Sequence, residues 1–139
     1  MKADSVLATI GGTPHIRLSR LFPDHEVWVK SERANPGGSI KDRIGLAMIE
    51  DAEQAGKLKP GGTIIEPTSG NTGMGLAMIS NTRGYSLTTP LSNMIPPEKR
   101  TTLRVFGANV LELEDNLCPA PGAPEGAIAK AQELSDRPE

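Results

Sequence analysis

The sequence is poor in cysteine, histidine and aromatic residues, and each shortage excludes a class of protein. Its one cysteine, Cys118, excludes an intrachain disulfide and a cysteine-rich metal site. Its two isolated histidines, His15 and His25, are too few for a zinc site, so we expect no bound metal. Few aromatic residues and a net charge of −2 leave no basic or stacking surface, which argues against nucleic-acid binding.

Long apolar runs are also absent from the sequence. No stretch of the 139 residues approaches the length of a membrane span. The opening M-K-A-D-S lacks the apolar segment of a signal peptide, so we expect a cytoplasmic protein without membrane association. The composition, 37% hydrophobic and 23% charged, is typical of a soluble globular domain, and the length suffices for one core.

A glycine turn that leads into a helix is the first motif present. It is the stretch N-P-G-G-S-I-K-D at residues 35–42. Ser39 and Asp42 have the spacing of a capping box, and Gly56 follows as a stop signal, so we expect a helix over residues 39–56. Apolar residues recur at helical spacing along it, at Ile40, Ile44, Ala47, Met48 and Ala52.

Lys41 falls in the first turn of this predicted helix, where unpaired backbone N–H groups disfavour a cation. Lysines that react with carbonyl groups do so through the neutral amine, so the position suits a reactive lysine. A solvated lysine that happens to follow a helix cap is the alternative, and this stretch alone does not exclude it.

A second motif joins a predicted strand to a second predicted helix. The apolar run T-I-I at residues 63–65 is followed by T-S-G-N-T-G at residues 68–73 and then by a helix to about Asn81. Such a loop directs backbone N–H groups and hydroxyls at one point and suits an anion. An ordinary strand-to-helix connection uses the same residue types and is the alternative interpretation.

The remaining patterns continue the alternation of strand and helix. We expect strands at residues 15–18, 26–32, 86–89 and 109–113, helices at 97–106 and 125–134, and a proline-rich loop at 118–124. Pro90 should shorten the strand that precedes it. The alternation predicts an α/β fold, with a parallel sheet covered by helices on both faces, a three-layer α/β/α domain.

Several segments together resemble the cysteine synthase (O-acetylserine sulfhydrylase) family of pyridoxal phosphate enzymes, with cystathionine β-synthase as a close relative. The matching segments are I-G-G-T-P at residues 10–14 with residues 16–18, residues 35–44 and residues 66–73, in family order. Shorter matches are K-L-K-P-G at 57–61 and residues 83–85 and 126–131. The resemblance implies the fold of the tryptophan synthase β-subunit, truncated to its N-terminal portion. It also implies that residues 1–35 form strands that pack with a C-terminal domain, and that residues 36–139 form the small domain.

The resemblance implies a role for each residue of the two motifs. Lys41 corresponds to the lysine that binds pyridoxal 5'-phosphate covalently and then removes the substrate α-proton. Asn71 corresponds to a ligand of the cofactor, and Thr68, Ser69, Asn71 and Thr72 form the substrate-binding loop, called here the asparagine loop (residues 68–73). The implied reaction replaces the acetate of O-acetyl-L-serine by sulfide and gives L-cysteine.

Other functions remain open at this stage. Cystathionine β-synthase-like chemistry would use serine and homocysteine at the same residues. A catalytically inactive fragment could instead bind the C-terminal carboxylate of a partner, as cysteine synthases bind serine acetyltransferase. Homodimers are usual in the family, and its phosphate loop lies in a second half with no counterpart here. Residues 88–97 and 113–124 depart from the family pattern, which leaves the second substrate undecided.

Overall fold

The computed structural model describes residues 2–114 and 126–136, and its centre is a three-stranded parallel sheet. The strands are β3 (Thr63–Ile65), β4 (Ser86–Ser92) and β5 (Asn109–Leu113), in the order β3-β4-β5. The register pairs Ile64 with Leu87 and Thr89 with Val110. The strands predicted for these segments are therefore confirmed, and the proline-rich loop predicted at 118–124 lies outside the described residues.

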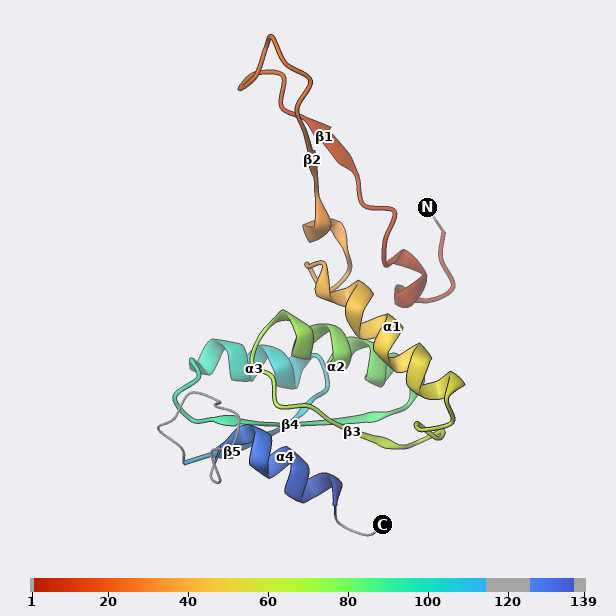
Figure 1. The fold of residues 1–139 in the computed structure, drawn as a ribbon, viewed down its shortest axis with the longest axis vertical. Helices are drawn as coiled ribbons and strands as arrows, with labels where there is room; N and C mark the ends of the chain where they lie inside the picture. Colours follow the sequence, from red (N-terminus) through yellow and green to blue (C-terminus); the bar gives the residue numbers. More distant parts are fainter. Residues whose placement is uncertain (1, 115–125, 137–139) are drawn as a thin grey trace.

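Helices cover both faces of this sheet (Figure 1). One face carries α2 (Asn71–Arg83) and α3 (Pro97–Val105), with α1 (Lys41–Gln54) packed on α2. The opposite face carries α4 (Ala127–Ser135), which packs against β4 and β3. The predicted three-layer arrangement is confirmed.

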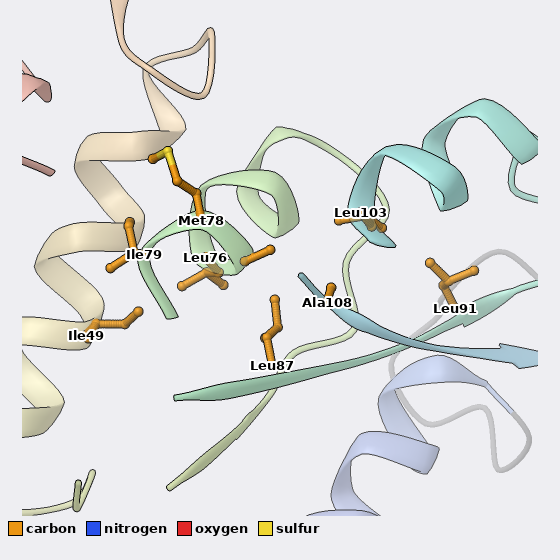
Figure 2. Close-up of a cluster of buried hydrophobic side chains, with 9 residues drawn as sticks. Ile49, Leu76, Met78, Ile79, Leu87, Leu91, Leu103 and Ala108 are labelled. Atoms are coloured by element: carbon orange, nitrogen blue, oxygen red, sulfur yellow. The ribbon is translucent and has the colours of Figure 1, made fainter. Parts of the chain in front are cut away.

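The hydrophobic core lies between α2 and the sheet, with α1 and α3 closing its sides (Figure 2). Leu76, Ile79, Leu87 and Leu103 are its largest fully buried members, and they come from α2, β4 and α3. Helix α2 is buried at every position from 75 to 80, so it is the central helix of the domain. The asparagine loop runs into the first turn of α2 and is therefore attached to the most buried of the described helices.

A two-stranded antiparallel sheet stands apart from this body (Figure 1). It consists of β1 (His15–Arg17) and β2 (Trp28–Lys30), both shorter than predicted, flanked by the 3-10 turns Val6–Thr9 and Glu32–Ala34. Apolar side chains on it remain exposed, with Ile16 at 46% and Trp28 at 50%. The hairpin contributes nothing to the described core.

Pro90 does not shorten its strand, and that prediction was wrong. Ser86 N–H donates to Gly62 O and Glu66 N–H to Thr88 O, so even-numbered residues of β4 face β3. Pro90 follows the same alternation, but β3 ends at a residue that pairs with Thr88. Because no strand lies on that side of Pro90, its missing N–H breaks no ladder bond.

The apolar residues of α1 recur at helical spacing, as the sequence indicates. The face of the helix on which they lie is, however, not the buried one. Ile40, Ile44 and Met48 are 50%, 42% and 46% exposed, whereas Gly45 and Ile49 are buried. Gly45 lets α2 approach closely, because a Cβ there would lie 3.1 Å from Ile79 Cδ1. Close packing on α2 therefore determined the orientation of the helix.

Candidate functional site

Lys41 is the first residue of α1, as predicted. Its backbone N–H donates to Ser39 Oγ at 3.1 Å, whereas Ile40, the residue directly before the helix, makes no side-chain cap hydrogen bond. The capping box itself is a correction, because Asp42 does not bond back to Ser39. The Asp42 carboxylate instead accepts the Gly37 N–H at 2.6 Å and ties the glycine turn to the first turn of α1.

Asp42 is fully buried, which sequence reasoning missed. Burial raises the pKa of Asp42, and the hydrogen bond from Gly37 lowers it in part. Among the described residues, its Oδ1 has no hydrogen-bond partner. A Cβ at residue 37 would collide with this carboxylate, so the turn that precedes Lys41 requires glycine there.

Asn35 holds three segments together at the other end of the turn. It is 3% exposed, and its Oδ1 accepts the Gly11 N–H at 2.8 Å. Its Nδ2 donates to Glu32 Oε2 and to Ser39 O, each at 3.0 Å. One amide side chain therefore joins the I-G-G-T-P segment, the end of the hairpin and the turn that leads to Lys41.

Glu32 and Arg43 form an ion pair beside Asn35. Arg43 Nε lies 2.8 Å from Glu32 Oε2, and Thr13 Oγ1 donates to Glu32 Oε1 at 2.5 Å. Hydrogen bonds from Arg43, then Thr13 and Asn35, lower the pKa of Glu32 to about 2. Sequence reasoning missed this cluster, since four residues spread over positions 13–43 show no local spacing pattern.

The asparagine loop is anchored to β4 by one hydroxyl. Thr89 Oγ1 donates to Thr68 O at 2.8 Å and accepts the Thr68 N–H at 3.3 Å. Thr89 is 0% exposed, so the anchor is shielded from water. Gly73 closes the other end of the loop, because a Cβ there would lie 2.6 Å from Thr68 Cγ2 and 2.9 Å from Leu103 Cδ2.

The α2 N-terminus opens onto a cavity of about 370 Å³. Gly70 occupies the N-cap without a side-chain cap, so first-turn N–H groups are left for another acceptor. Ser69 and the exposed Asn71 line the cavity from the loop. Glu98 and Lys99 line it from the first turn of α3, and neither was predicted as a site residue.

The structure brings the two motifs to the same end of the domain. A Cβ on Gly75 would lie 3.3 Å from the Lys41 carbonyl oxygen, and Gly75 is one helical turn beyond Asn71. Thr68, Ser69 and Thr72 are half-buried in the loop before it. The backbone of Lys41 therefore packs about one turn from the asparagine loop, at the starts of two helices.

Metal binding and membrane crossing find no support in the described part of the chain. Across residues 2–114 and 126–136, no group of three or more histidine, cysteine, aspartate or glutamate residues could hold a metal ion. None of the helices described there is long and apolar enough to cross a membrane.

This geometry defines an α/β domain in which Lys41 and the asparagine loop lie at the N-termini of two adjoining helices. Comparison with known proteins then places it: a model of the family described as pyridoxal-phosphate dependent enzyme matches residues 6–139. The chain belongs to the pyridoxal-phosphate-dependent enzyme family.

The similar proteins are enzymes of this class. A cysteine synthase from Flavobacterium sp. is 48% identical over 98% of this chain and 43% of its own length. One from Staphylococcus aureus is 47% identical over 96% of this chain and 42% of its own. The chain therefore spans less than half the length of these relatives.

Solved structures agree on the fold but differ in activity. An O-ureido-L-serine synthase superposes with a TM-score of 0.85 at 41% identity, over 98% of this chain and 42% of that one. A hydrogen sulfide-producing enzyme from Fusobacterium nucleatum superposes with a TM-score of 0.84 at 34% identity, over 100% of this chain and 44% of that one.

Proposed function

We propose that this chain supplies the lysine and the asparagine loop of a cysteine synthase-like enzyme. The reaction replaces the acetate of O-acetyl-L-serine by sulfide and yields L-cysteine and acetate. The observation that carries the proposal is the close packing of Lys41 against Gly75, one turn from the uncapped start of α2. The identity to cysteine synthases supports the same reaction.

The residues present fit pyridoxal phosphate as the cofactor. Lys41 offers the amine that would bind it covalently, and Asn71 offers an amide to its ring substituents. When bound, the cofactor supplies an electron sink for the substrate α-carbon. The Lys41 amine would also take the α-proton, and the N–H groups and hydroxyls of Thr68, Ser69 and Thr72 would hold the substrate carboxylate.

Borohydride reduction in the presence of pyridoxal phosphate tests the cofactor lysine. We expect a pyridoxyl mass on the peptide that contains Lys41, measured by mass spectrometry. Lys41→Ala should remove that adduct, while Lys59→Ala, at an exposed lysine of a turn, should leave it. An adduct spread evenly over many lysines in both variants would contradict the assignment.

The substrate pair is the finer part of the proposal. Similar proteins include an O-ureido-L-serine synthase and a hydrogen sulfide-producing enzyme, so related sites serve different donors or acceptors. Product analysis with O-acetylserine and sulfide, and separately with serine and homocysteine, distinguishes cysteine synthesis from cystathionine β-synthase-like chemistry. Cystathionine without cysteine would replace our proposal by the second reaction.

A catalytically inactive, carboxylate-binding role is the second candidate. It is favoured by the uncapped α2 N-terminus, which needs no lysine to accept a carboxylate. A partner such as serine acetyltransferase would then place its C-terminus in the asparagine loop. Calorimetry with a C-terminal peptide and its amidated form tests this, since only the free carboxylate should bind.

We also infer a homodimer and a cytoplasmic location from the family resemblance. The exposed apolar side chains of the hairpin support the proposal that residues 1–35 pack with a C-terminal domain, leaving residues 36–139 as the small domain. Light scattering on the purified protein and cell fractionation test the first two inferences. A monomer at micromolar concentration, or a membrane-bound fraction, would contradict them.

A further inference from the structure

Among the residues that the structure describes, Asp42 is the one ionisable side chain that is buried. Burial of a carboxyl group is unfavourable unless the group is hydrogen-bonded, and in this part of the chain its hydrogen bond comes from the Gly37 N–H alone. Its place in the first turn of α1 compensates in part, because a helix N-terminus favours an anion. The chain therefore keeps a buried carboxyl group directly after Lys41.

The Asp42 carboxyl group lies between the glycine turn and α2. On the side of the turn, its Oδ2 accepts the Gly37 N–H at 2.6 Å. On the side of α2, a Cβ on Gly75 would lie 3.3 Å from Asp42 Oδ1 and 3.4 Å from Asp42 Cα. Because Gly75 has no side chain, the two helices meet closely at this point. Asp42 therefore contacts the turn that precedes Lys41 and the helix that follows the asparagine loop.

The turn needs such a contact, because its two glycines are conformationally permissive. Gly38 has a φ of +80°, which glycine adopts more readily than other residues. Asn35 fixes the start of the turn by donating to Ser39 O at 3.0 Å. At its end, Asp42 supplies the side-chain hydrogen bond to the glycine pair in the described part of the chain. Loss of that bond would loosen the turn directly before α1.

We propose that Asp42 is a positioning residue, which fixes the start of α1 against α2 and thereby sets the spacing between Lys41 and the asparagine loop. The proposal rests on the proposed function of Lys41. Asp42 acts through Lys41 and not on a reacting atom, with one carboxyl oxygen as an acceptor for the turn and the other against Gly75. Gly75 is its counterpart, because a side chain there would push the two helices apart.

Small changes at this contact should have large effects on the chemistry. A displacement of about 1 Å in a reacting group can cost about 100-fold in rate. Lys41 begins α1, and Asn71 begins α2 one turn before Gly75, so a shift between the helices moves the lysine relative to the loop. Ile49 also packs in the core shared with α2, but it lies about two turns farther along α1.

Nuclear Overhauser effects test the spacing without any cofactor. The wild-type chain should show a contact between the α-protons of Gly75 and Asp42, because a Cβ on Gly75 would lie 3.4 Å from Asp42 Cα. Asp42→Ala should remove this contact and speed exchange of the Gly37 amide about 10-fold or more. Asp42→Asn keeps an oxygen for the Gly37 N–H and should restore both signals. An unchanged contact and amide in Asp42→Ala, or equal losses in Asp42→Asn, would overturn the proposal.

The rate of borohydride-trapped adduct formation at Lys41 tests the consequence for the cofactor lysine. At one pyridoxal phosphate concentration, Asp42→Ala should lower this rate about 10-fold to 100-fold, and Asp42→Asn should restore it. Ile49→Ala is the matched control, because it weakens the same helix packing farther from Lys41. It should change the rate less than about twofold, since distant sites act independently. Equal slowing in Ile49→Ala would show a general loosening of α1 and overturn the proposal.

Gly75→Ala tests the spacing while the bond between Gly37 and Asp42 stays in place. It should slow the Lys41 adduct as Asp42→Ala does, and a wild-type rate would overturn the proposal. The amides of Ile79 and Leu87, two fully buried core residues, report whether each variant is folded. A wild-type chain without any adduct at Lys41 contradicts the proposed function, whereas the contact between Gly75 and Asp42 still decides the positioning role.

Discussion

At the scale of single residues, the site depends on positions where a side chain would not fit. Gly73 is one of them, since its missing Cβ leaves room for Thr68 and Leu103. Gly73→Ala should lower the free energy of unfolding by about 1–3 kcal/mol, because the added methyl overpacks the loop. Urea denaturation measures it.

The matched control for that change is Gly70→Ala in the same loop. A Cβ at Gly70 meets no heavy atom within 4 Å, so this variant should lose less stability. Equal losses at both positions would mean that the backbone of the loop, and not the contact with Thr68, determines the cost.

The ionisation of Glu32 makes the stability of the cluster that holds the turn before Lys41 depend on pH. Its pKa is lowered to about 2 in the folded chain, so its ionised form stabilises the fold above its unfolded pKa of about 4.3. This stability is lost as pH falls from about 4.3 through 2. Glu32→Gln should therefore be less stable than wild type at pH 7, and the difference should shrink as pH falls from about 4.3 to 2.

Urea unfolding across this pH range measures the difference between the two proteins. Asp24→Asn, at an exposed position of the hairpin tip, is the control and should parallel wild type at every pH. A constant difference between Glu32→Gln and wild type from pH 7 to pH 2 would show that the ion pair with Arg43 contributes nothing.

At the scale of elements, Thr89 connects β4 to the asparagine loop. Thr89→Val removes the hydroxyl that bonds both backbone groups of Thr68, which should cost about 1–3 kcal/mol of unfolding free energy. The Thr68 amide should also exchange faster with solvent. Thr89→Ser keeps the hydroxyl and should restore slow exchange. Slow exchange of the Thr68 amide in Thr89→Val would contradict the role of the hydroxyl.

The orientation of α1 gives a second prediction at this scale. Ile49 is 2% exposed and Ile44 is 42% exposed. Ile49→Ala should cost about 2–5 kcal/mol, because it leaves a cavity against α2, while Ile44→Ala should cost clearly less. Thermal and urea unfolding of the two variants measure this difference. A larger loss of stability in Ile44→Ala than in Ile49→Ala would contradict this orientation and favour burial of the apolar face.

At the scale of the whole molecule, the hairpin carries apolar surface that the described residues leave uncovered. Trp28 is the only tryptophan and is half exposed, so acrylamide should quench its fluorescence efficiently in the 139-residue chain. If residues 1–35 pack with a C-terminal domain, quenching should fall when the chain is continued after Glu139 by the remaining sequence of the Staphylococcus aureus cysteine synthase. Unchanged quenching would contradict the packing of residues 1–35 against that domain.

The sequence by itself determined the order of elements and the two motifs. The turn glycines, the Ser39 hydroxyl that accepts the Lys41 N–H and the T-I-I strand act over a few residues, so they can be predicted without knowledge of the fold. The two motifs are short and contiguous, which made the resemblance to the family specific. The match of the family model over residues 6–139 confirms that resemblance. The roles of Lys41, Asn71 and their neighbours stay predictions.

Only the tertiary structure decided which faces are buried and which distant groups meet. Asp42 became a buried anchor for Gly37, and Ile44 stayed exposed, because α1 turned its glycine face to α2. Pro90 stayed within β4 because β3 ends before it. Such outcomes depend on packing between segments far apart in sequence, and the local spacing of residues does not predict that packing.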